Sequence, residues 1–161
     1  WATVDVMANE AIQDINIVAG CLKQWFRELP DPLLTYQLYP AFIEASKIEN
    51  DFLRQVRLHE QVNNLPDANY ATLRFLMAHL DRIRAHESIN QMSAHNLAIV
   101  FGPTLLRSPH EAQMAGAGAA ASHGGVGQMY FPDMSLQCKA IETILLKYRD
   151  IFVESDEDDL S

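Results

Sequence analysis

Cysteine and long apolar runs are scarce in this chain of 161 residues, and each scarcity excludes a class of protein. The two cysteines, Cys21 and Cys138, lie far apart in apolar stretches with helical spacing, so we expect buried free thiols and no disulfide framework. No apolar run approaches the roughly 20 residues that a membrane-spanning helix needs. The N-terminal stretch WATVDVMANE lacks the basic region and the apolar run of a secretory signal peptide. Together these absences favour a cytoplasmic protein that does not insert into a membrane.

Basic residues are also few, with 12 Lys and Arg against 21 Asp and Glu, for a net charge of −9. Five of the acidic residues lie in the stretch ESDEDD at 154–159, so the rest of the chain is only mildly acidic. A chain without a basic excess is a poor match for nucleic acid, which we therefore exclude as a partner. We expect residues 153–161 to form a solvated, disordered tail.

The motifs of common catalytic and metal sites are missing as well. No glycine-rich phosphate loop follows a strand pattern, and the sequence holds neither a GxSxG nucleophile motif nor an HExxH metal motif. His79 and His86 lie on one predicted helix with no further ligand nearby, and His110 and His123 lie in a loop-like segment without ligand spacing. We therefore expect no resident metal ion and interpret these histidines as surface residues.

Helical periodicity dominates what is present, and strand alternation is almost absent. Apolar residues recur at intervals of three and four, and Asp14, Asn50 and Ser93 stand where helix N-caps are expected. The sequence predicts an all-α domain at 1–152, a helical bundle of about six helices with one long Gly/Ala-rich loop at about 108–128. The predicted helices span about 15–28, 37–47, 51–63, 67–86, a segment that begins after Ser93, and 134–150.

The apolar stripes of these helices predict which side chains enter the core. The predicted core positions are Ile15, Val18, Leu22, Phe26 and Leu29 in the first helix; Leu38, Phe42 and Ala45 in the second; Phe52, Val56, His59 and Val62, or their neighbours, in the third; Tyr70, Leu73, Leu76, Met77, Leu80 and Ile83 in the fourth; and Leu136, Ala140, Ile144, Leu145 and Tyr148 in the last. In the segment after Ser93, Gly102-Pro103 predicts a break or a kink, because proline lacks the amide donor that a helix interior uses.

Two basic side chains share one face of the first predicted helix, in the segment CLKQWFRELPDPLL. On a helical wheel Arg27 falls about 40° from Lys23, whereas the apolar stripe centres about 100° from Lys23 on the other side. Gly20 lies near the same basic face and leaves it uncluttered. The pair fits a solvated basic face as well as it fits a site for an anionic surface or for the carbonyls of a partner. Helical periodicity alone leaves both interpretations open.

A single amide, Asn96, stands at the start of the apolar stretch in SAHNLAIVFGPTLLR at 93–107. An amide has donors and an acceptor that must be satisfied wherever it is buried. Asn96 either ties a neighbouring loop to the helix, or points out of the end of the domain and hydrogen-bonds a partner. Periodicity does not choose between these two roles.

Three stretches, in this order, resemble signature segments of Rho-type GTPase-activating (RhoGAP) domains. LKQWFRELPDPLL at 22–34 resembles the family's LKxxxRELPxPL segment, LPDANYATLRFLMAHLDRI at 65–83 resembles its LPxxNxxTLxxLxxHLxxV helix, and NLAIVFGPTLLR at 96–107 resembles its NLAxVFGPxLLR segment. The likeness covers about residues 12–108 and, more loosely, 134–152. Three motifs in the family's order are a far more specific signal than any one of them.

The resemblance implies an all-helical module that binds a Rho-family small GTPase in its GTP-bound form and promotes GTP hydrolysis. It implies a regulator without a cofactor of its own, since GTP and Mg²⁺ belong to the partner GTPase. By motif position, Lys23, Arg27 and Asn96 match residues with which the family contacts its partner. Pro103 matches a helix-breaking proline of the family, which we interpret as structural.

The family's catalytic arginine is expected in a GIFRxSG-like segment roughly 40 residues before the LKxxxRELP helix. Only 21 residues precede Leu22 here and none resembles that segment, so we expect this sequence to lack the arginine finger. Arg107 is not a substitute, because family members commonly carry an arginine at this position alongside the true finger. The alternative to an activating domain is therefore a catalytically impaired domain that binds the GTPase or serves as a scaffold.

Overall fold

The computed structural model describes residues 14–110 and 133–152, and the regular structure in these two stretches is entirely helical. Six of the eight helices with assigned bounds are substantial and two are single turns, which confirms the predicted all-α fold. The helices are α1 (Ile15–Glu28), α2 (Tyr39–Lys47), α3 (Asp51–Asn63), α4 (Asp67–Arg84), α5 (Glu87–Asn90), α6 (Ala94–Leu105), α8 (Met134–Leu146) and α9 (Tyr148–Ile151). Most of the predicted Gly/Ala-rich loop and the whole acidic tail lie outside the described residues.

The three predicted N-caps are confirmed by hydrogen bonds to the first turn of each helix. The Asp14 carboxylate accepts from the Asn16 amide at 2.9 Å, and the Asn50 side chain accepts from the Leu53 amide at 3.0 Å. The Ser93 hydroxyl accepts from the amide of Asn96 at 3.1 Å. The first amides of a helix have no partner within it, so these local side chains decide where the helices begin.

Several predicted helix limits are wrong by a few residues. The second helix begins at Tyr39 and not at 37, because Pro40 lacks an amide donor and is best accommodated in the first turn. The fourth ends at Arg84, after which α5 forms one turn and stops at Gln91, whose φ of 58° is left-handed. The last predicted helix is divided into α8 and α9 at Lys147.

The helix α6 runs through Gly102 and Pro103 and ends at Leu105, so the chain does not break at the predicted position. Pro103 lies close enough to the helix end that its missing donor affects only the last turn. That turn is closed by the amide of Leu106, which donates to the carbonyl of Gly102 at 3.0 Å. The Thr104 hydroxyl adds a bond to the carbonyl of Val100 at 3.1 Å.

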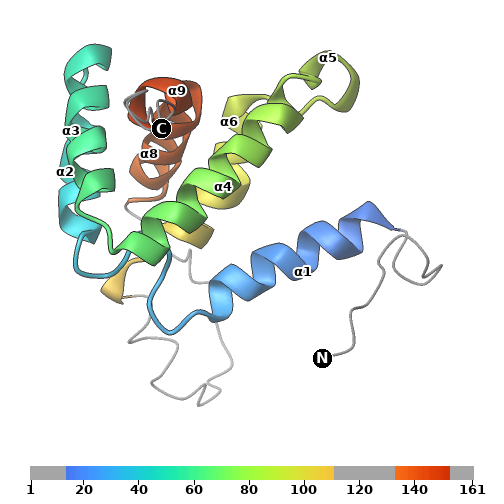
Figure 1. Cartoon of the computed structure of the whole chain (residues 1–161), viewed down its shortest axis with the longest axis horizontal. Coiled ribbons are helices and arrows are strands. Elements are labelled where there is room, and N and C mark those ends of the chain that lie inside the picture. Colours follow the sequence, from blue (N-terminus) through green and yellow to red (C-terminus); the bar gives the residue numbers. More distant parts are fainter. Residues whose placement is uncertain (1–13, 111–132, 153–161) are drawn as a thin grey trace, which may run out of the picture.

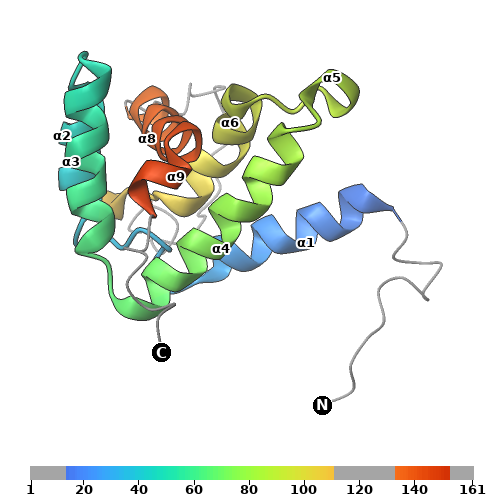
Figure 2. The same cartoon turned by 45° about the horizontal axis from the view of Figure 1, so that its top comes forward.

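The core forms where α6 and α8 pack together, which is the most extensive helix–helix contact among the described residues. Around α8 lie α2 and α3 on one side and α4 on another, as Figures 1 and 2 show. The predicted apolar stripes of α2, α4 and α8 are confirmed, because each points into this core. Phe42, Met77 and Ile144 are completely buried there.

The apolar stripe of α1, by contrast, was predicted to be buried and is mostly exposed. Ile15, Val18 and Leu22 keep 78%, 38% and 38% of their accessible surface, and only Phe26, at 3%, is buried. Figures 1 and 2 both show α1 leaving the other helices toward its N-terminal end. Cys21 is exposed for the same reason, whereas Cys138 is buried as predicted. Periodicity identifies an apolar face, but it does not say whether another helix covers that face.

The prediction for α3 is also partly wrong, since Phe52 and Val56 are exposed while Leu58 and Val62 are buried. A charged residue, Arg54, occupies the buried side of the first turns. Its guanidinium donates to the carbonyl of Ile48 at 2.8 Å and to the Thr143 hydroxyl on α8 at 3.1 Å. These bonds satisfy a buried cation, and a count of apolar residues does not foresee them.

One glycine allows α6 and α8 to approach so closely. A Cβ atom added at Gly102 would lie 3.0 Å from both the Cα and the backbone nitrogen of Cys138. Backbone atoms inside α8 cannot move aside as a flexible side chain would. Glycine is therefore required here for packing and not for its backbone freedom.

We expect Gly102→Ala to lower the free energy of unfolding by about 1–3 kcal/mol, the usual cost of overpacking a core. The matched control is Gly20→Ala in α1, where an added Cβ would meet no atom within 4 Å. That control should be neutral or stabilising, because alanine is the better helix former. Chemical denaturation followed by circular dichroism measures both. Equal stability of the two variants would contradict the tight α6–α8 contact.

A second contact joins α2 to the start of α8. The Tyr39 hydroxyl donates to the Asp133 carboxylate at 2.8 Å, and the Gln137 amide donates to the same hydroxyl at 3.5 Å. Burial of the hydroxyl, together with the neighbouring Asp133 carboxylate, raises the pKa of Tyr39 well above its ordinary value near 10. In the folded domain this hydroxyl therefore stays protonated at pH values where a solvated tyrosine ionises.

We expect the stabilising effect of Tyr39 to decline as the pH rises above about 10. The unfolded chain loses the Tyr39 proton there while the folded chain keeps it, so raising the pH favours unfolding. Tyr39→Phe should cost about 1 kcal/mol at neutral pH, and this difference from the parent should shrink in alkali. Urea denaturation of both proteins between pH 8 and 11 measures it. A difference that does not change with pH would refute the shifted titration.

Candidate functional site

The two predicted basic residues lie on α1, the helix that leaves the bundle. Arg27 is exposed in the last turn and Lys23 is half-buried one turn earlier. Phe26, which anchors this end of the helix in the core, faces away from them, as expected from the helical wheel. Gly20 adds an open position one turn before Lys23, since no described atom would contact a Cβ there.

The third predicted residue, Asn96, lies in the first turn of α6 and is exposed. Its side-chain amide donates to the main-chain carbonyl of Gln91 at 2.9 Å. Asn96 thus ties the turn between α5 and α6 to its helix, which is the first of the two roles considered from sequence. Its side-chain oxygen accepts no hydrogen bond from the described residues, so this acceptor remains open to a partner.

The structure places these residues on adjoining helices without direct contact between them. α1 makes its main helix contact with α6, and the amide of Leu34 just beyond α1 donates to the carbonyl of Leu105 at 3.1 Å. Asn96 lies about 14 Å from Leu105 along α6, from the helical rise of 1.5 Å per residue. In residues 14–110 and 133–152, no hydrogen bond or ion pair links Asn96 to either basic residue.

Arg107 is the side chain whose role sequence reasoning did not find. Its guanidinium donates to the main-chain carbonyl of Leu29, the residue that ends α1. The guanidinium carbon also lies 5.7 Å from the centroid of the Tyr36 ring. Arg107 is thus committed to the contact between α1 and α6. No periodic pattern could reveal this, because the partner is a backbone carbonyl distant in sequence.

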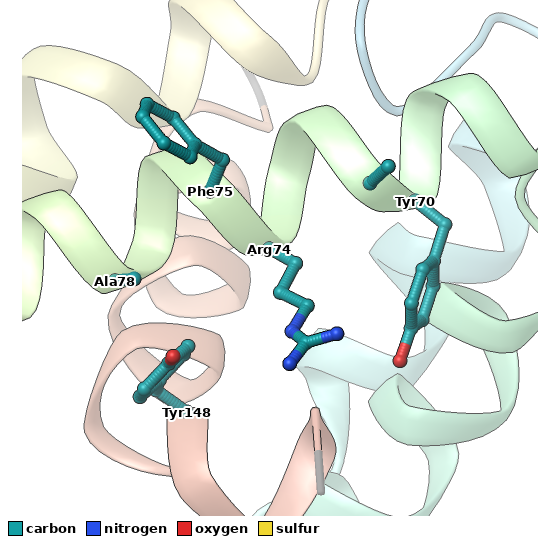
Figure 3. Close-up of a pocket in the computed structure, with 6 residues that line it drawn as sticks. Tyr70, Arg74, Phe75, Ala78 and Tyr148 are labelled. Carbon is teal, nitrogen blue, oxygen red and sulfur yellow. The ribbon is translucent and has the colours of Figure 1, made fainter. Parts of the chain in front are cut away.

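A shallow groove of about 430 Å³ lies elsewhere, on the outer side of α4 next to α9. Figure 3 shows the Arg74 side chain extending into the space between Tyr70 and Tyr148, with Phe75 farther along α4. None of the three predicted site residues lines this groove. The groove brings together aromatic side chains and one cation but no pair of acid and base groups, so it offers no catalytic arrangement.

Two further classes of site are absent from the described part of the chain. Nowhere in it do three His, Cys, Asp or Glu side chains stand close enough to hold a metal ion. None of its helices combines the length and apolarity that crossing a membrane requires. The three predicted residues and the α1–α6 contact therefore remain the candidate site.

Comparison with known proteins identifies the family of this chain. The family described as RhoGAP domain matches the chain over residues 2–110, well over half of its length. The chain belongs to the RhoGAP domain family. Members of this family are GTPase activators, which regulate a partner GTPase and have no cofactor of their own.

Relatives of this RhoGAP chain are similar in sequence and in fold. N-chimaerin from Rattus norvegicus is 55% identical over 111 residues, which cover 69% of this chain and 33% of N-chimaerin. GTPase-activating protein pac-1 from Caenorhabditis elegans is 41% identical over 147 residues, which cover 89% of this chain and 8% of pac-1. The chain thus spans a third or less of the length of these two relatives.

Two solved structures share the helical arrangement of this RhoGAP chain. Human Rho GTPase activating protein 15 has a TM-score of 0.75 and 34% identity, over 94% of this chain and 64% of that one. The BH domain from GRAF, the GTPase regulator associated with focal adhesion kinase, has a TM-score of 0.70 and 34% identity, over 86% of this chain and 66% of that one. The similarity confirms the RhoGAP-like helical bundle.

We expect Asn96→Ala to lower the free energy of unfolding by no more than about 1 kcal/mol, because the lost bond to Gln91 is exposed to water. In a chain of this length that corresponds to a melting temperature lower by about 2–4 °C. The comparison is Ser93→Ala, which removes the N-cap of the same helix and should cost about as much or more. Thermal melting measures both. A loss of several kcal/mol for Asn96→Ala would show that Asn96 is mainly structural.

Proposed function

We propose that this RhoGAP domain binds a GTP-loaded Rho-family GTPase through a face made by Lys23, Arg27 and Asn96, and promotes GTP hydrolysis by that partner. We call these three residues the GTPase-binding face. The face combines two cations that can bind carboxylates or main-chain carbonyls with an amide oxygen that can accept from a main-chain N–H. GTP and Mg²⁺ enter with the partner GTPase.

The observation that carries this proposal is that two cations, Lys23 and Arg27, lie one turn apart on one face of α1, and neither has an acidic partner among the described residues. Four other basic residues form ion pairs within single helices: Lys47–Glu44, Arg54–Asp51, Arg57–Glu60 and Arg84–Asp81. The nearest carboxylate to Arg27 in sequence, Glu28, accepts instead from Gln24 at 2.7 Å. Two like charges four residues apart repel modestly, and an anionic partner surface would offset that repulsion.

A second candidate function is binding without acceleration of hydrolysis. In RhoGAP-type catalysis an arginine enters the GTPase site and neutralises charge on the transferred phosphoryl group, with an effect of roughly 10³–10⁵ in rate. The first 22 residues of this sequence contain no arginine or lysine. Arg107 is engaged by Leu29 and Tyr36, so it is not available to enter a partner site. Neither the first 22 residues nor Arg107 therefore supplies a finger arginine. This favours a chain that binds the GTPase without accelerating its hydrolysis of GTP.

The domain extends, in this proposal, over residues 1–152, and its place is the cytoplasm, where Rho-family GTPases are regulated. The relatives are several times longer than the matched region, so further segments of a longer protein would direct recruitment to membranes or cytoskeleton. Neither nucleic acid nor membrane insertion has a part in the proposed function.

The two candidate functions differ in the rate of GTP hydrolysis, and promotion of hydrolysis requires a finger arginine that residues 1–22 do not contain. We therefore expect this 161-residue chain by itself to behave as the second candidate, stimulating single-turnover GTP hydrolysis by Rho, Rac and related GTPases weakly or not at all. The same chain should bind at least one of these GTPases more tightly in its GTP-bound form than in its GDP-bound form. Acceleration of 10³-fold or more would show that an arginine within these residues serves as the finger. Absence of binding to every GTP-loaded Rho-family member would refute the proposed function.

The binding face itself is tested by Arg27→Ala, which should weaken GTPase binding roughly tenfold while leaving the melting temperature near that of the parent. The matched control is Arg57→Ala on α3, where an exposed arginine is lost together with its ion pair to Glu60 at 2.9 Å. Fluorescence titration with a GTP-analogue-loaded GTPase measures both. If Arg57→Ala weakens binding as much as Arg27→Ala, the effect reflects overall charge and not a defined face.

A further inference from the structure

We propose that Arg107 is a positioning residue for the GTPase-binding face. By joining the end of α1 to the end of α6, it sets where Lys23 and Arg27 stand relative to Asn96. The proposal rests on the proposed function, but its structural part, the control of α1 by Arg107, can be tested without any GTPase.

The contacts of Arg107 meet at the point where α1 ends. Its Nη2 donates to the carbonyl of Leu29, two residues beyond Arg27. Carbonyls in the last turn of a helix have no partner within it, and a cation there also interacts favourably with the helix dipole. The guanidinium carbon also lies over the Tyr36 ring, 5.7 Å from its centroid. At this distance the cation–π attraction adds to the hydrogen bond.

The other restraints on α1 in the described structure lie at the same end of the helix: Phe26 and Leu29 pack against the core, and the amide of Leu34 donates to the carbonyl of Leu105. Of its residues only Phe26 is buried, and Figures 1 and 2 show the N-terminal end of the helix apart from the other helices. A helix held at one end pivots about that end, and Lys23 lies about 9 Å from Leu29 along the helix axis. Loss of the Arg107 contact would therefore displace the two cations by a larger distance than it displaces Leu29.

Asn96, on the other hand, belongs to the rigid part of the domain. It lies in the first turn of α6, whose later turns pack against α8 at Gly102. Arg107 comes two residues after that helix ends. One rigid helix thus connects Asn96 to Arg107, and one side chain connects Arg107 to α1. The spacing between the two parts of the binding face depends on this joint, together with Phe26 in the core and the bond from the Leu34 amide to the Leu105 carbonyl.

Arginine suits this joint better than lysine would. A guanidinium is planar and carries several donors, so it can donate to a carbonyl and lie against a ring at the same time. A lysine ammonium keeps the charge but lacks the flat face and the fork of donors. We therefore expect Arg107→Lys to retain part of the effect and Arg107→Ala to retain none.

The first experiment measures the position of α1 directly. Cys21 on α1 is exposed and can carry one spin label, and Leu146→Cys on α8 carries the second. Cys138→Ala removes the buried thiol, so that only these two positions react. Pulsed electron paramagnetic resonance should give one narrow distance distribution for this parent. Arg107→Ala should broaden the distribution, and Arg107→Lys should give an intermediate width.

The matched control is Arg54→Ala. Arg54 is a buried arginine, and like Arg107 it donates to a main-chain carbonyl, but it joins α3 to α8 and has no hydrogen bond to α1. Its loss should lower the melting temperature and leave the label distances unchanged. The GTPase affinity, measured without spin labels, should fall about tenfold in Arg107→Ala and change less than twofold in Arg54→Ala.

The outcomes separate this proposal from the proposed function. If Arg107→Ala leaves the distances unchanged and lowers only the melting temperature, as Arg54→Ala does, the positioning role is overturned. If Arg107→Ala broadens the distance distribution but does not change the GTPase affinity, Arg107 holds α1 without shaping a binding face. The proposal fails in that case too. If the parent binds no Rho-family GTPase, the proposed function fails, while the label distances still decide whether Arg107 positions α1.

Discussion

The close approach of α6 to α8 is the contact on which the rest of this domain depends. It is possible because Gly102 places no Cβ against the backbone of α8 at Cys138. The other core helices, α2, α3 and α4, pack around the α8 side of this pair, and α1 attaches to the α6 side. A rigid α6 also carries the two features of the candidate site that lie outside α1, with Asn96 at its start and Arg107 just beyond its end.

Charge is used in three ways in this acidic chain. Ion pairs between side chains three residues apart neutralise Lys47, Arg57 and Arg84 on single helices. Two arginines, Arg107 and Arg54, bind main-chain carbonyls where helices or loops meet, and Arg54 also forms an ion pair with Asp51, so their charge stabilises tertiary contacts. Lys23 and Arg27 belong to neither group, and neither do Arg82, Lys139, Lys147 and Arg149 in the described residues. We assign the α1 pair to a partner because its two cations lie one turn apart on one face of the helix. A cation without a partner group inside the domain can bind an anionic group on another protein without breaking an existing contact.

The helical class, the capping residues and most of the buried stripes could be predicted because they depend on neighbours within one turn. Asp14, for example, caps α1 through an amide two residues away. Burial of the α1 and α3 stripes could not be predicted in the same way. Ile15 and Phe52 lie on apolar faces, yet no described helix covers them, and Arg54 enters the core because carbonyls and a hydroxyl happen to meet it there. Helix limits were also missed where special residues set them, as Pro40 does in the first turn of α2 and left-handed Gln91 does at the end of α5.

Sequence by itself determined that this chain is an all-helical RhoGAP domain, and it singled out Lys23, Arg27 and Asn96. Ordered motifs and helical spacing carry that information because both are local properties of the chain. Tertiary structure alone decided that Asn96 ties the α5–α6 turn, that α1 is held chiefly at one end, and that Arg107 joins it to α6. Each of these depends on a backbone carbonyl brought close by folding, and every residue type carries the same carbonyl, so no side-chain pattern can mark it in advance.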